Sequence, residues 1–368
     1  MIEKELVSVL QAYRWPGPVT DICPYGMGHI NTTYCVSCGA ARFVLQRISP
    51  AFRDPKGLME NIVGVTTFLK KKLAARGQDP MRGTLTVLPT RSGDLFFTDA
   101  QGASWRLLTF IENTVCHQTS DPALFEAAGK AFGDFQYMLR DFPAHTLHET
   151  LPRFHDTEDR LRLFKEALAA GSCGRAVTAR EEIDFVLARE QDCSVIMEAL
   201  RQRKLPLRVT HNDTKLNNVL MDAKTGEALC VVDLDTVMPG LSVNDFGDAI
   251  RFGANHSAED EPNLSNVNFD LTLFEAFTRG FLAGTRGCLT ENELAYLPWG
   301  ARLMTLECGI RFLTDYLQGD TYFHIQDPAQ NLRRCRTQFK LVSDMERQFA
   351  AMAAIIEKIT LPSGESSK

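Results

Sequence analysis

The sequence predicts an α+β fold of two lobes: a small antiparallel sheet with one main helix, then a large, mostly helical lobe. Segments with the alternation and composition of β-strands are concentrated in the first third of the chain. Beyond them, apolar residues recur at the spacing of amphipathic helices. The chain has 368 residues, of which 44% are apolar and 23% charged, so it can bury the core that two lobes require.

The first lobe is expected over residues 1–112. An amphipathic segment opens it, and Asp54 and Pro55, typical N-cap and first-turn residues, predict the main helix through about Leu73. Alternating or β-branched segments predict the sheet, at residues 32–36, 42–48, 85–88, 95–98 and 105–111. Residues 110–113 are the natural hinge to the second lobe.

The second lobe is expected over residues 113–361. Its helices are predicted near residues 121–140, 157–169, 179–203, 269–284, 291–317 and 328–358. Residues 362–368 are small and polar, so we expect a disordered tail there.

The chemically most informative segment is residues 210–218, together with the hairpin that follows it. Two short apolar runs flank a polar turn, which brings Asn218 and Asp233 to the same end of the hairpin, close enough to share one ion. Asp213 lies just before that end. A carboxylate that accepts a hydroxyl proton, beside two oxygen ligands for Mg²⁺, is what phosphoryl transfer from ATP needs.

Asp245 is a second candidate metal ligand, because it begins an Asp-Phe-Gly tripeptide. It follows a Pro239-Gly240 loop rather than the strand of the hairpin, and Phe246 begins a helical pattern. We therefore expect Asp245 to act as an N-cap or a loop brace.

Asp233, Asp235 and Thr236 also fit the pattern of aspartyl-phosphate phosphohydrolases, in which the first aspartate is the nucleophile. That reading requires a parallel α/β domain after the motif, whereas the sequence downstream is helical. It also leaves His211 and Asp213 without a role, so phosphoryl transfer to a hydroxyl is the favoured hypothesis.

The first lobe holds candidate nucleotide contacts. Gly26 and Gly28 stand in a hairpin whose backbone could approach phosphate oxygens. Glu60, in the main helix, would pair with a strand lysine, but residues 43–48 contain none. Either Arg47 substitutes or Gln46 occupies the position and the ion pair is absent.

At the hinge, Phe110 and Glu112 are the expected adenine contacts, through backbone groups. The net charge of −6 argues against broad binding of nucleic acid or acidic membranes, so the partners are expected to be small molecules. Nothing in the sequence has the length of a membrane span or the form of a leader, which makes the cytoplasm the default location. The ten cysteines lack a framework spacing, and we discount the Cys35 and Cys38 pair as a metal site. A monomer or a small homo-oligomer is expected.

The pattern of His211, Asp213 and Asn218 resembles the aminoglycoside-phosphotransferase-type kinase superfamily, which has a bilobal, protein-kinase-like fold. More closely, the segments at residues 26–31, 210–218, 233–240 and 245–251 resemble N-acetylhexosamine 1-kinases. This resemblance implies ATP- and Mg²⁺-dependent phosphorylation of the anomeric hydroxyl of N-acetylglucosamine or N-acetylgalactosamine. The preferred epimer and the anomer stay open.

The resemblance also implies residue roles. Asp213 would be the base and would contact the sugar, while Asn218 and Asp233 would hold Mg²⁺. Asp235 would either assist or satisfy backbone donors, and His211 would brace the loop rather than transfer protons.

For the sugar, planar polar groups beside aromatic faces are needed, and His29, Arg311 and Tyr322 are the predicted contacts. A choline, homoserine or aminoglycoside kinase is the nearer alternative. A nucleotide-binding regulator without catalysis is the more distant one.

Overall fold

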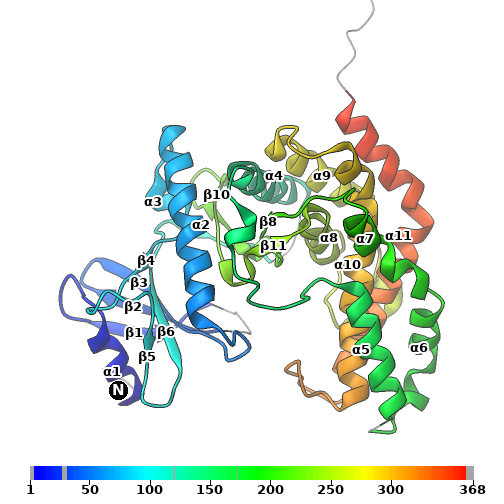
Figure 1. The fold of residues 1–368 in the computed structure, drawn as a ribbon, viewed down its shortest axis with the longest axis horizontal. Helices are drawn as coiled ribbons and strands as arrows, with labels where there is room; N and C mark the ends of the chain where they lie inside the picture. The colour runs from blue at the N-terminus through cyan, green and yellow to red at the C-terminus, as the bar shows by residue number, and fades with distance from the viewer. Residues whose placement is uncertain (1–3, 27–30, 119–120, 172, 362–368) are drawn as a thin grey trace, which may run out of the picture. The chain divides into compact units, whose positions relative to one another are not determined.

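The computed structural model describes residues 4–26, 31–118, 121–171 and 173–361, and it has the predicted α+β organisation (Figure 1). The chain divides into two compact units. Unit 1 comprises Met1–Val115, Asp141–Pro152 and Leu220–Pro239; unit 2 comprises Cys116–Arg140, Arg153–Val219 and Gly240–Lys368. The predicted tail at 362–368 lies outside the described residues.

Unit 1 contains an antiparallel sheet with the strand order β1-β2-β3-β6-β4 and β5 paired with β6. Its strands are β1 (Asp21–Pro24), β2 (Thr32–Cys38), β3 (Ala41–Arg47), β4 (Val87–Leu88), β5 (Phe97–Thr98) and β6 (Ser104–Thr109). Sequence periodicity missed β1, because this strand has four residues, is largely exposed and ends in proline.

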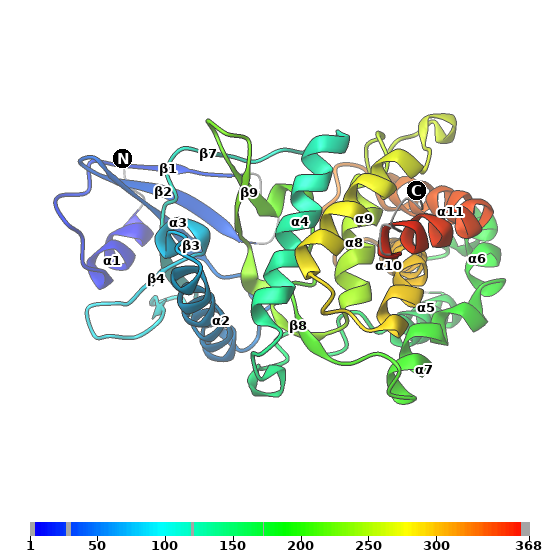
Figure 2. The same ribbon diagram turned by 90° about the horizontal axis from the view of Figure 1, so that it is seen from above.

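Two helices accompany this sheet, α1 (Lys4–Ala12) and α2 (Pro55–Ala75), as Figures 1 and 2 show. Buried side chains of α1 and of Tyr13 pack against Trp105 and other core residues of the sheet, and the Tyr13 hydroxyl donates to the Trp105 carbonyl at 2.6 Å. The α2 helix starts as predicted, because the Asp54 carboxylate accepts a hydrogen bond from the Gly57 N–H at 2.9 Å. A one-turn helix, α3 (Pro80–Gly83), follows.

Two later segments complete unit 1, so the grouping differs from the single boundary expected at residue 112. The hairpin of β9 (Val219–Asp222) and β10 (Ala228–Val231) forms as predicted, and β7 (Thr114–Val115) pairs with β9. Residues 141–152 join through Asn61, which exchanges hydrogen bonds with the backbone of His148, 2.8 Å each way. A long-range contact of this kind leaves no periodic signal in the sequence.

Unit 2 is helical, with α4 beside α9 and α10 beside α11 (Figure 2). Its helices are α4 (Pro122–Leu139), α5 (Thr157–Ala170), α6 (Arg180–Leu187), α7 (Val195–Arg201), α8 (Ser242–Gly253), α9 (Leu271–Thr285), α10 (Glu291–Gln318) and α11 (Gln330–Thr360). In the part of the chain that the structure covers, no helix has the length and apolar character needed to cross a bilayer.

The α4 and α9 helices approach each other through glycines at four-residue spacing. A Cβ atom on Gly280 would lie 1.9 Å from the Glu126 carbonyl oxygen, and one on Gly133 would lie 2.2 Å from that of Phe281. Real Cβ atoms do not come this close to backbone oxygens. The packing of the two helices therefore depends on the absence of side chains at these positions.

The prediction of a single helix at residues 179–203 is wrong. The chain there forms α6, a 3-10 segment (Glu190–Ser194) and α7. Residues at the break have partners on other helices. The Arg189 guanidinium pairs with Glu346 at 2.7 Å, and Asp192 pairs with Arg302. Ion pairs with other helices thus hold the residues of this break in place.

Candidate active site

The loop of residues 210–218 lies in unit 2. It begins at the end of strand β8 (Arg208–Thr210), which sequence reasoning did not identify, and ends in a 3-10 turn, Leu216–Asn218. The predicted base, Asp213, stands in its middle.

Helix α8 fixes the backbone of this loop on both sides of the predicted base. The Asp245 carboxylate accepts hydrogen bonds from the N–H groups of His211, at 2.9 Å, and Asn212, at 2.7 Å. The Asp248 carboxylate accepts from the Thr214 N–H at 2.9 Å. Charged acceptors on backbone donors are the stronger kind of hydrogen bond, so the loop is held firmly.

Of the two roles expected for Asp245, the structure gives it that of a loop brace and not that of an N-cap. The α8 helix starts at Ser242, before the predicted start at Phe246, which places Asp245 in its first turn. Its side chain is buried and also accepts a hydrogen bond from Gln136 at 2.8 Å. Burial raises the pKa of the Asp245 carboxyl, against the lowering effect of these hydrogen bonds.

Close packing sets the position of α8 against α10. A Cβ atom on Gly247 would lie 2.2 Å from the Gly300 carbonyl oxygen, and one on Gly300 would lie 2.1 Å from that of Val243. The helix that braces the loop is thus seated backbone to backbone.

His211 has the environment of a bracing residue. It is fully buried, and its ring contacts the edges or faces of Phe132 and Phe135, with centroids 5.6 and 6.0 Å away. Its Nδ1 accepts a hydrogen bond from the Asp213 N–H at 3.2 Å. The histidine therefore orients the base through the backbone.

The Asp213 carboxylate has a cation beside it. Lys215 Nζ lies 2.8 Å from Asp213 Oδ1, and Asn218 Nδ2 donates to Asp213 Oδ2 at 3.1 Å and to its carbonyl oxygen at 2.8 Å. Burial by itself would raise the pKa of Asp213, but the charge and hydrogen bond of Lys215, together with the charge of Arg251, outweigh it in sum. The pKa is held below its ordinary value, so Asp213 is ionised at neutral pH and able to accept a proton.

Sequence reasoning missed Lys215. The available signal was its place two residues after the base, where a positive charge lowers the pKa of a carboxylate. The pKa of Lys215 is itself raised, since Asp213 and Asp248 outweigh the effect of its burial.

Asn218 fits the role of a metal ligand. Its amide nitrogen makes the two hydrogen bonds to Asp213, and its amide oxygen accepts none from the residues that the structure describes. Where the hydrogen-bond network assigns the amide in this way, its oxygen is left for a cation.

A buried ion pair supports the loop from the other side. His155 Nε2 donates to the Asn212 carbonyl at 3.0 Å, and His155 Nδ1 lies 3.1 Å from Glu307 Oε1 of α10. Thr157 donates to the second oxygen of Glu307 at 2.8 Å. Burial by itself would lower the pKa of His155, but the Glu307 carboxylate raises it above its ordinary value. Burial by itself would raise the pKa of Glu307, but His155 lowers it below its ordinary value. Two acceptors facing the ring fit a doubly protonated imidazolium.

Unit 1 carries the other half of the predicted chemistry. Asp233 begins the 3-10 turn Leu234–Thr236 in a left-handed conformation, with φ of 60°. Asp235 accepts a hydrogen bond from Asn31 Nδ2 at 2.6 Å and pairs with Arg106, whose Nη1 lies 2.5 Å from Asp235 Oδ1.

Of the two residues left open for the place of the strand lysine, Gln46 is the one near this cluster. Its amide donates to Thr33 Oγ1 at 3.1 Å and accepts from Arg106 Nε at 2.9 Å. Arg47 is exposed, because neighbouring residues of a strand point to opposite faces. Sequence reasoning did not single out Arg106, although a charge inside the apolar run of β6 was a usable signal.

Glu60 makes no ion pair with a residue of β3 among the described residues. It lies beside His148, with Glu60 Oε2 2.8 Å from His148 Nε2, and 3.9 Å from Lys56 Nζ. Which of Arg47 and Gln46 takes the place of the strand lysine stays a prediction. The nucleotide roles of Arg47 and Glu60 stay predictions.

Of the glycine-bearing hairpin, only part is described. Gly26 has a φ of +79°, which favours glycine, and it lies two residues after the end of β1. Gly28 and His29 lie outside the described residues. Their contacts with nucleotide and sugar stay predictions.

At the hinge, the side chains of Phe110 and Glu112 share one partner. The Arg42 guanidinium lies 4.0 Å from the centroid of the Phe110 ring and forms an ion pair with Glu112. Tyr25 contacts Phe110 edge to face, at 5.4 Å between centroids. The hydrogen bond from Arg42 lowers the pKa of Glu112. These contacts order the hinge side chains, while adenine binding by the backbone stays a prediction.

Arg311 and Tyr322 come together in unit 2. The Arg311 guanidinium lies 5.5 Å from the ring centroids of Phe154 and Phe323, and 5.9 Å from that of Tyr322. It makes no hydrogen bond or ion pair within the described part of the chain. Asp315 orders the aromatic segment by accepting the N–H groups of residues 321–323, at 2.7 to 3.0 Å.

The donor set suits Mg²⁺ rather than a metal caged by protein. Among the described residues, no three or more His, Cys, Asp or Glu side chains converge as a metal site. Mg²⁺ commonly takes one or two protein oxygens and completes its shell with phosphates and water. Asn218 and Asp233 supply oxygens of this kind. They belong to different units, so their sharing of one ion stays a prediction.

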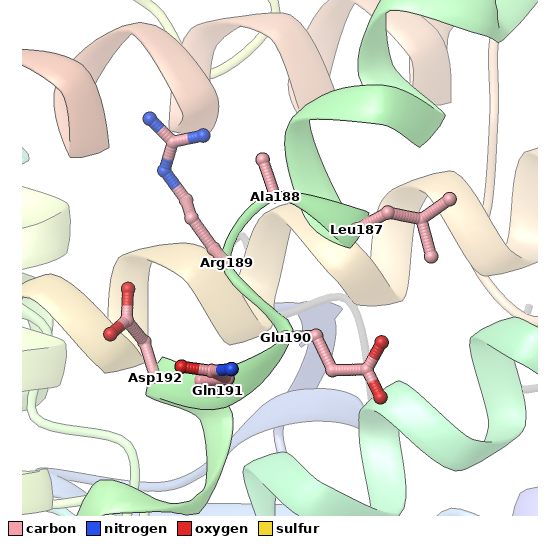
Figure 3. Close-up of a pocket in the computed structure, with 6 residues that line it drawn as sticks. All are labelled: Leu187, Ala188, Arg189, Glu190, Gln191 and Asp192. Carbon is pink, nitrogen blue, oxygen red and sulfur yellow. The ribbon is translucent and has the colours of Figure 1, made fainter.

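A cavity of about 450 Å³ lies elsewhere, along residues 187–192 of the broken helix (Figure 3). In Figure 3, Arg189 and Asp192 extend to one side of the chain, and Leu187 and Glu190 to the other. Arg189, Glu190 and Asp192 all have partners of opposite charge on other segments. The charges here are satisfied by the fold and do not mark a ligand site.

The alternative in which Asp233 is a nucleophile is not supported by the fold. The pairings of the six-stranded sheet, and that of β7 with β9, are antiparallel. After the Asp233 turn the chain continues into α8–α11, not into the parallel α/β domain that a phosphohydrolase of this type requires.

Comparison with known proteins agrees with this geometry. Residues 21–281 match the family described as the phosphotransferase enzyme family. The fold is similar to that of a microcompartment-associated aminopropanol kinase, with a TM-score of 0.58, 17% identity and coverage of 94% of this chain and 98% of that one.

Two further solved structures share the fold. An aminoglycoside phosphotransferase from Alicyclobacillus acidocaldarius has a TM-score of 0.61 at 12% identity, covering 96% of each chain. A spectinomycin phosphotransferase in complex with ADP and spectinomycin has a TM-score of 0.53 at 11% identity, covering 97% of this chain and 98% of that one.

Proposed function

The chain belongs to the phosphotransferase enzyme family, and we propose that it is an ATP- and Mg²⁺-dependent kinase that acts on the anomeric C1 hydroxyl of N-acetylhexosamines. The products would be a sugar 1-phosphate and ADP. The observation that carries the kinase assignment is the ionised Asp213, set between Lys215 and Asn218. A related fold bound to ADP supports the choice of nucleotide.

In this reaction Asp213 orients the acceptor hydroxyl and takes its proton. The hydroxyl oxygen bonds to the γ-phosphorus while the bond from that phosphorus to the bridging oxygen breaks, and ADP leaves. Bound Mg²⁺, held by Asn218 and Asp233, would neutralise charge on the phosphates. Because the transition state is loose, positioning and charge account for most of the rate enhancement.

The surroundings of Arg311 support a sugar over a cationic acceptor. The Arg311 guanidinium forms no hydrogen bond or ion pair with the described residues, so it would repel an ammonium group and can donate to hydroxyl or acetamido oxygens. The rings of Phe154, Tyr322 and Phe323 provide flat apolar faces beside it. His29 and Asp213 would complete the sugar contacts.

A second candidate is a kinase for an amino alcohol or an aminoglycoside, which the similar folds favour. Such an acceptor is cationic and calls for unpaired carboxylates at its site. The two candidates therefore differ in the sign of the charge that the acceptor meets.

One assay separates them. ADP release with Mg²⁺-ATP would be measured against N-acetylglucosamine, N-acetylgalactosamine, unmodified hexoses, choline, homoserine, aminopropanol and aminoglycosides. We expect turnover with N-acetylhexosamines, and ³¹P NMR of the product should show an anomeric phosphate. Turnover with an amino alcohol or aminoglycoside alone would overturn the sugar assignment and leave the kinase assignment standing.

A further inference from the structure

We propose that Arg106 and Asp235 form a buried positioning pair, which holds the turn bearing Asp233 against the sheet so that its carboxylate can serve Mg²⁺-nucleotide. The pair would stand in for the lysine–glutamate ion pair of kinases, for which residues 43–48 supply no lysine. The inference rests on the proposed kinase function, because that function makes Asp233 a ligand of Mg²⁺.

Among the described residues of unit 1, no other ion pair has both side chains as buried as this one. The side chains of Arg106 and Asp235 are 3% and 4% exposed, and their closest atoms are 2.5 Å apart. Arg106 Nη1 and Asp235 Oδ1 make no hydrogen bond to other described groups, so each is compensated by the charge of the other. Two charges are rarely removed from water in this way without a specific partner, so each residue fixes the other in place.

Arg106 is anchored in the middle of the sheet. It lies on β6, directly across from Gln46 of β3, and its Nε donates to the Gln46 amide oxygen at 2.9 Å. Gln46 in turn donates to Thr33 of β2 at 3.1 Å. Three adjacent strands therefore set the position of one guanidinium.

Asp235 transmits that position to two segments. It stands two residues after Asp233 in the same turn, and it accepts a hydrogen bond from Asn31 Nδ2 at 2.6 Å. Asn31 accepts a hydrogen bond from the Ser49 N–H at 2.9 Å. The end of the glycine-bearing segment and the Asp233 turn are thereby fixed to the same arginine.

The turn needs such support. Asp233 has φ of 60°, a conformation that residues other than glycine adopt only at a cost. On its far side, the Val237 carbonyl accepts a hydrogen bond from Asn61 of α2 at 3.1 Å. The turn is therefore held by two contacts. The contact of Arg106 with Asp235 is an ion pair, and the contact of Asn61 with the Val237 carbonyl is a neutral hydrogen bond.

The same contacts make Asp235 a residue that supports the turn rather than a ligand of the metal. Its two oxygens face Arg106 and Asn31, and the residue is 3% exposed. A carboxylate committed in this way orients a neighbouring ligand, as residues behind metal ligands commonly do.

The test uses the full chain and measures binding of a non-hydrolysable ATP analogue by calorimetry, with and without Mg²⁺. The informative variant is the double substitution Arg106→Met with Asp235→Asn, which removes both charges together and leaves no unpaired buried ion. We expect its Kd with Mg²⁺ to rise about 10- to 100-fold. Its Kd without Mg²⁺ should change less than about twofold, and its Tm should stay near that of the wild type.

A matched control is Arg336→Met with Glu182→Gln, which removes an ion pair between α11 and α6. Its Mg²⁺ dependence should equal that of the wild type. The single variant Asp235→Asn leaves Arg106 unpaired. Its nucleotide affinity should no longer depend on Mg²⁺, and its Tm should be lower than that of the wild type.

Two outcomes would overturn the inference. One is a folded double variant that retains the full Mg²⁺ dependence of the wild type. The other is equal loss of affinity with and without Mg²⁺, which would make the pair a general support of the sheet. The readout contains no sugar, so failure of the acceptor assignment leaves it intact, whereas a wild-type protein without any Mg²⁺-dependent nucleotide binding would refute both proposals.

Discussion

Asp213 is the residue on which the chemistry depends, and its neighbours decide its protonation. The lysine at 2.8 Å holds the carboxyl pKa low, and the asparagine at 3.1 Å orients the second oxygen. An acceptor that is ionised at neutral pH can take the substrate proton without first losing its own.

Asp213→Asn tests this directly. The amide has the same shape but cannot accept the hydroxyl proton in the same way, so kcat should fall about 10²- to 10⁴-fold. The Kd for Mg²⁺-nucleotide should change little, which calorimetry can measure. A variant with full turnover would refute the assignment of the base.

Lys215→Met tests the charge effect. Removing the cation raises the pKa of Asp213, so the acid limb of the plot of kcat/KM against pH should move to higher pH. Lys224→Met, at an exposed turn position, is the matched control and should leave the profile in place. A profile unchanged in Lys215→Met would mean that another group sets the acid limb.

The pair of His155 and Glu307 makes a prediction about stability and pH. The pKa of His155 is raised in the fold, so its contribution is complete below its unfolded value and is lost as pH rises through the folded value. The pKa of Glu307 is lowered, so its contribution is lost as pH falls through its folded value. The pair should stabilise most in mildly acidic solution, between the two unfolded values.

Glu307→Gln should therefore lower the free energy of unfolding by about 3–5 kcal/mol near pH 6, and by less above neutral pH. Urea unfolding across a pH series would measure the difference. Asp248, Arg160 and Arg311 also bear on this pair electrostatically and are unchanged in the variant. A pH-independent loss would show that packing, not charge, is responsible.

At the scale of elements, helix contacts seat the catalytic loop. The α8 helix carries both carboxylates that hold the loop backbone, and its own seat against α10 depends on Gly247 and Gly300. The α4 and α9 helices are packed by the same device. Small residues in these helices are therefore structural requirements.

Gly133→Ala should destabilise the protein. Its Cβ would lie 2.2 Å from the Phe281 carbonyl oxygen, and forcing the helices apart costs about 1–3 kcal/mol. Gly64→Ala is the control, because its Cβ would be 3.7 Å from the Phe142 ring, and alanine favours a helix by about 0.5–1 kcal/mol over glycine. Thermal unfolding should show a lower Tm for Gly133→Ala and no decrease for Gly64→Ala. Equal effects of the two substitutions would contradict the proposed close packing.

At the scale of the whole molecule, the predicted base and the predicted metal aspartate belong to different units. Asp213 and Asn218 are in unit 2, and Asp233 is in unit 1, joined to Asn218 through a single hairpin. Both units are thus required for the proposed reaction.

Asp233→Ala should abolish the gain in nucleotide affinity that Mg²⁺ gives, while binding without Mg²⁺ persists. Chelation of the metal should have the same effect on the wild type, with recovery after Mg²⁺ is added. Glu227→Gln, at the exposed turn of the same hairpin, is the control. Unchanged Mg²⁺ dependence in Asp233→Ala would place the ion elsewhere.

Local patterns predicted much of the fold. Capping residues gave the start of α2, and apolar periodicity gave most of the long helices, because both signals lie within a few residues of one another. The short strands β1, β7 and β8 and the break between α6 and α7 were missed. Their positions depend on partners far along the chain.

The sequence by itself determined the α+β class, the hairpin between Asn218 and Asp233, and the motif of Asp213, since residue spacing and backbone periodicity carry that information. Only the tertiary structure decided which carboxylates brace its loop, and that Arg106 rather than a β3 side chain meets Asp235. Those contacts join residues as far as 129 positions apart. Burial and charge at such distances are properties of packing, which no local pattern encodes.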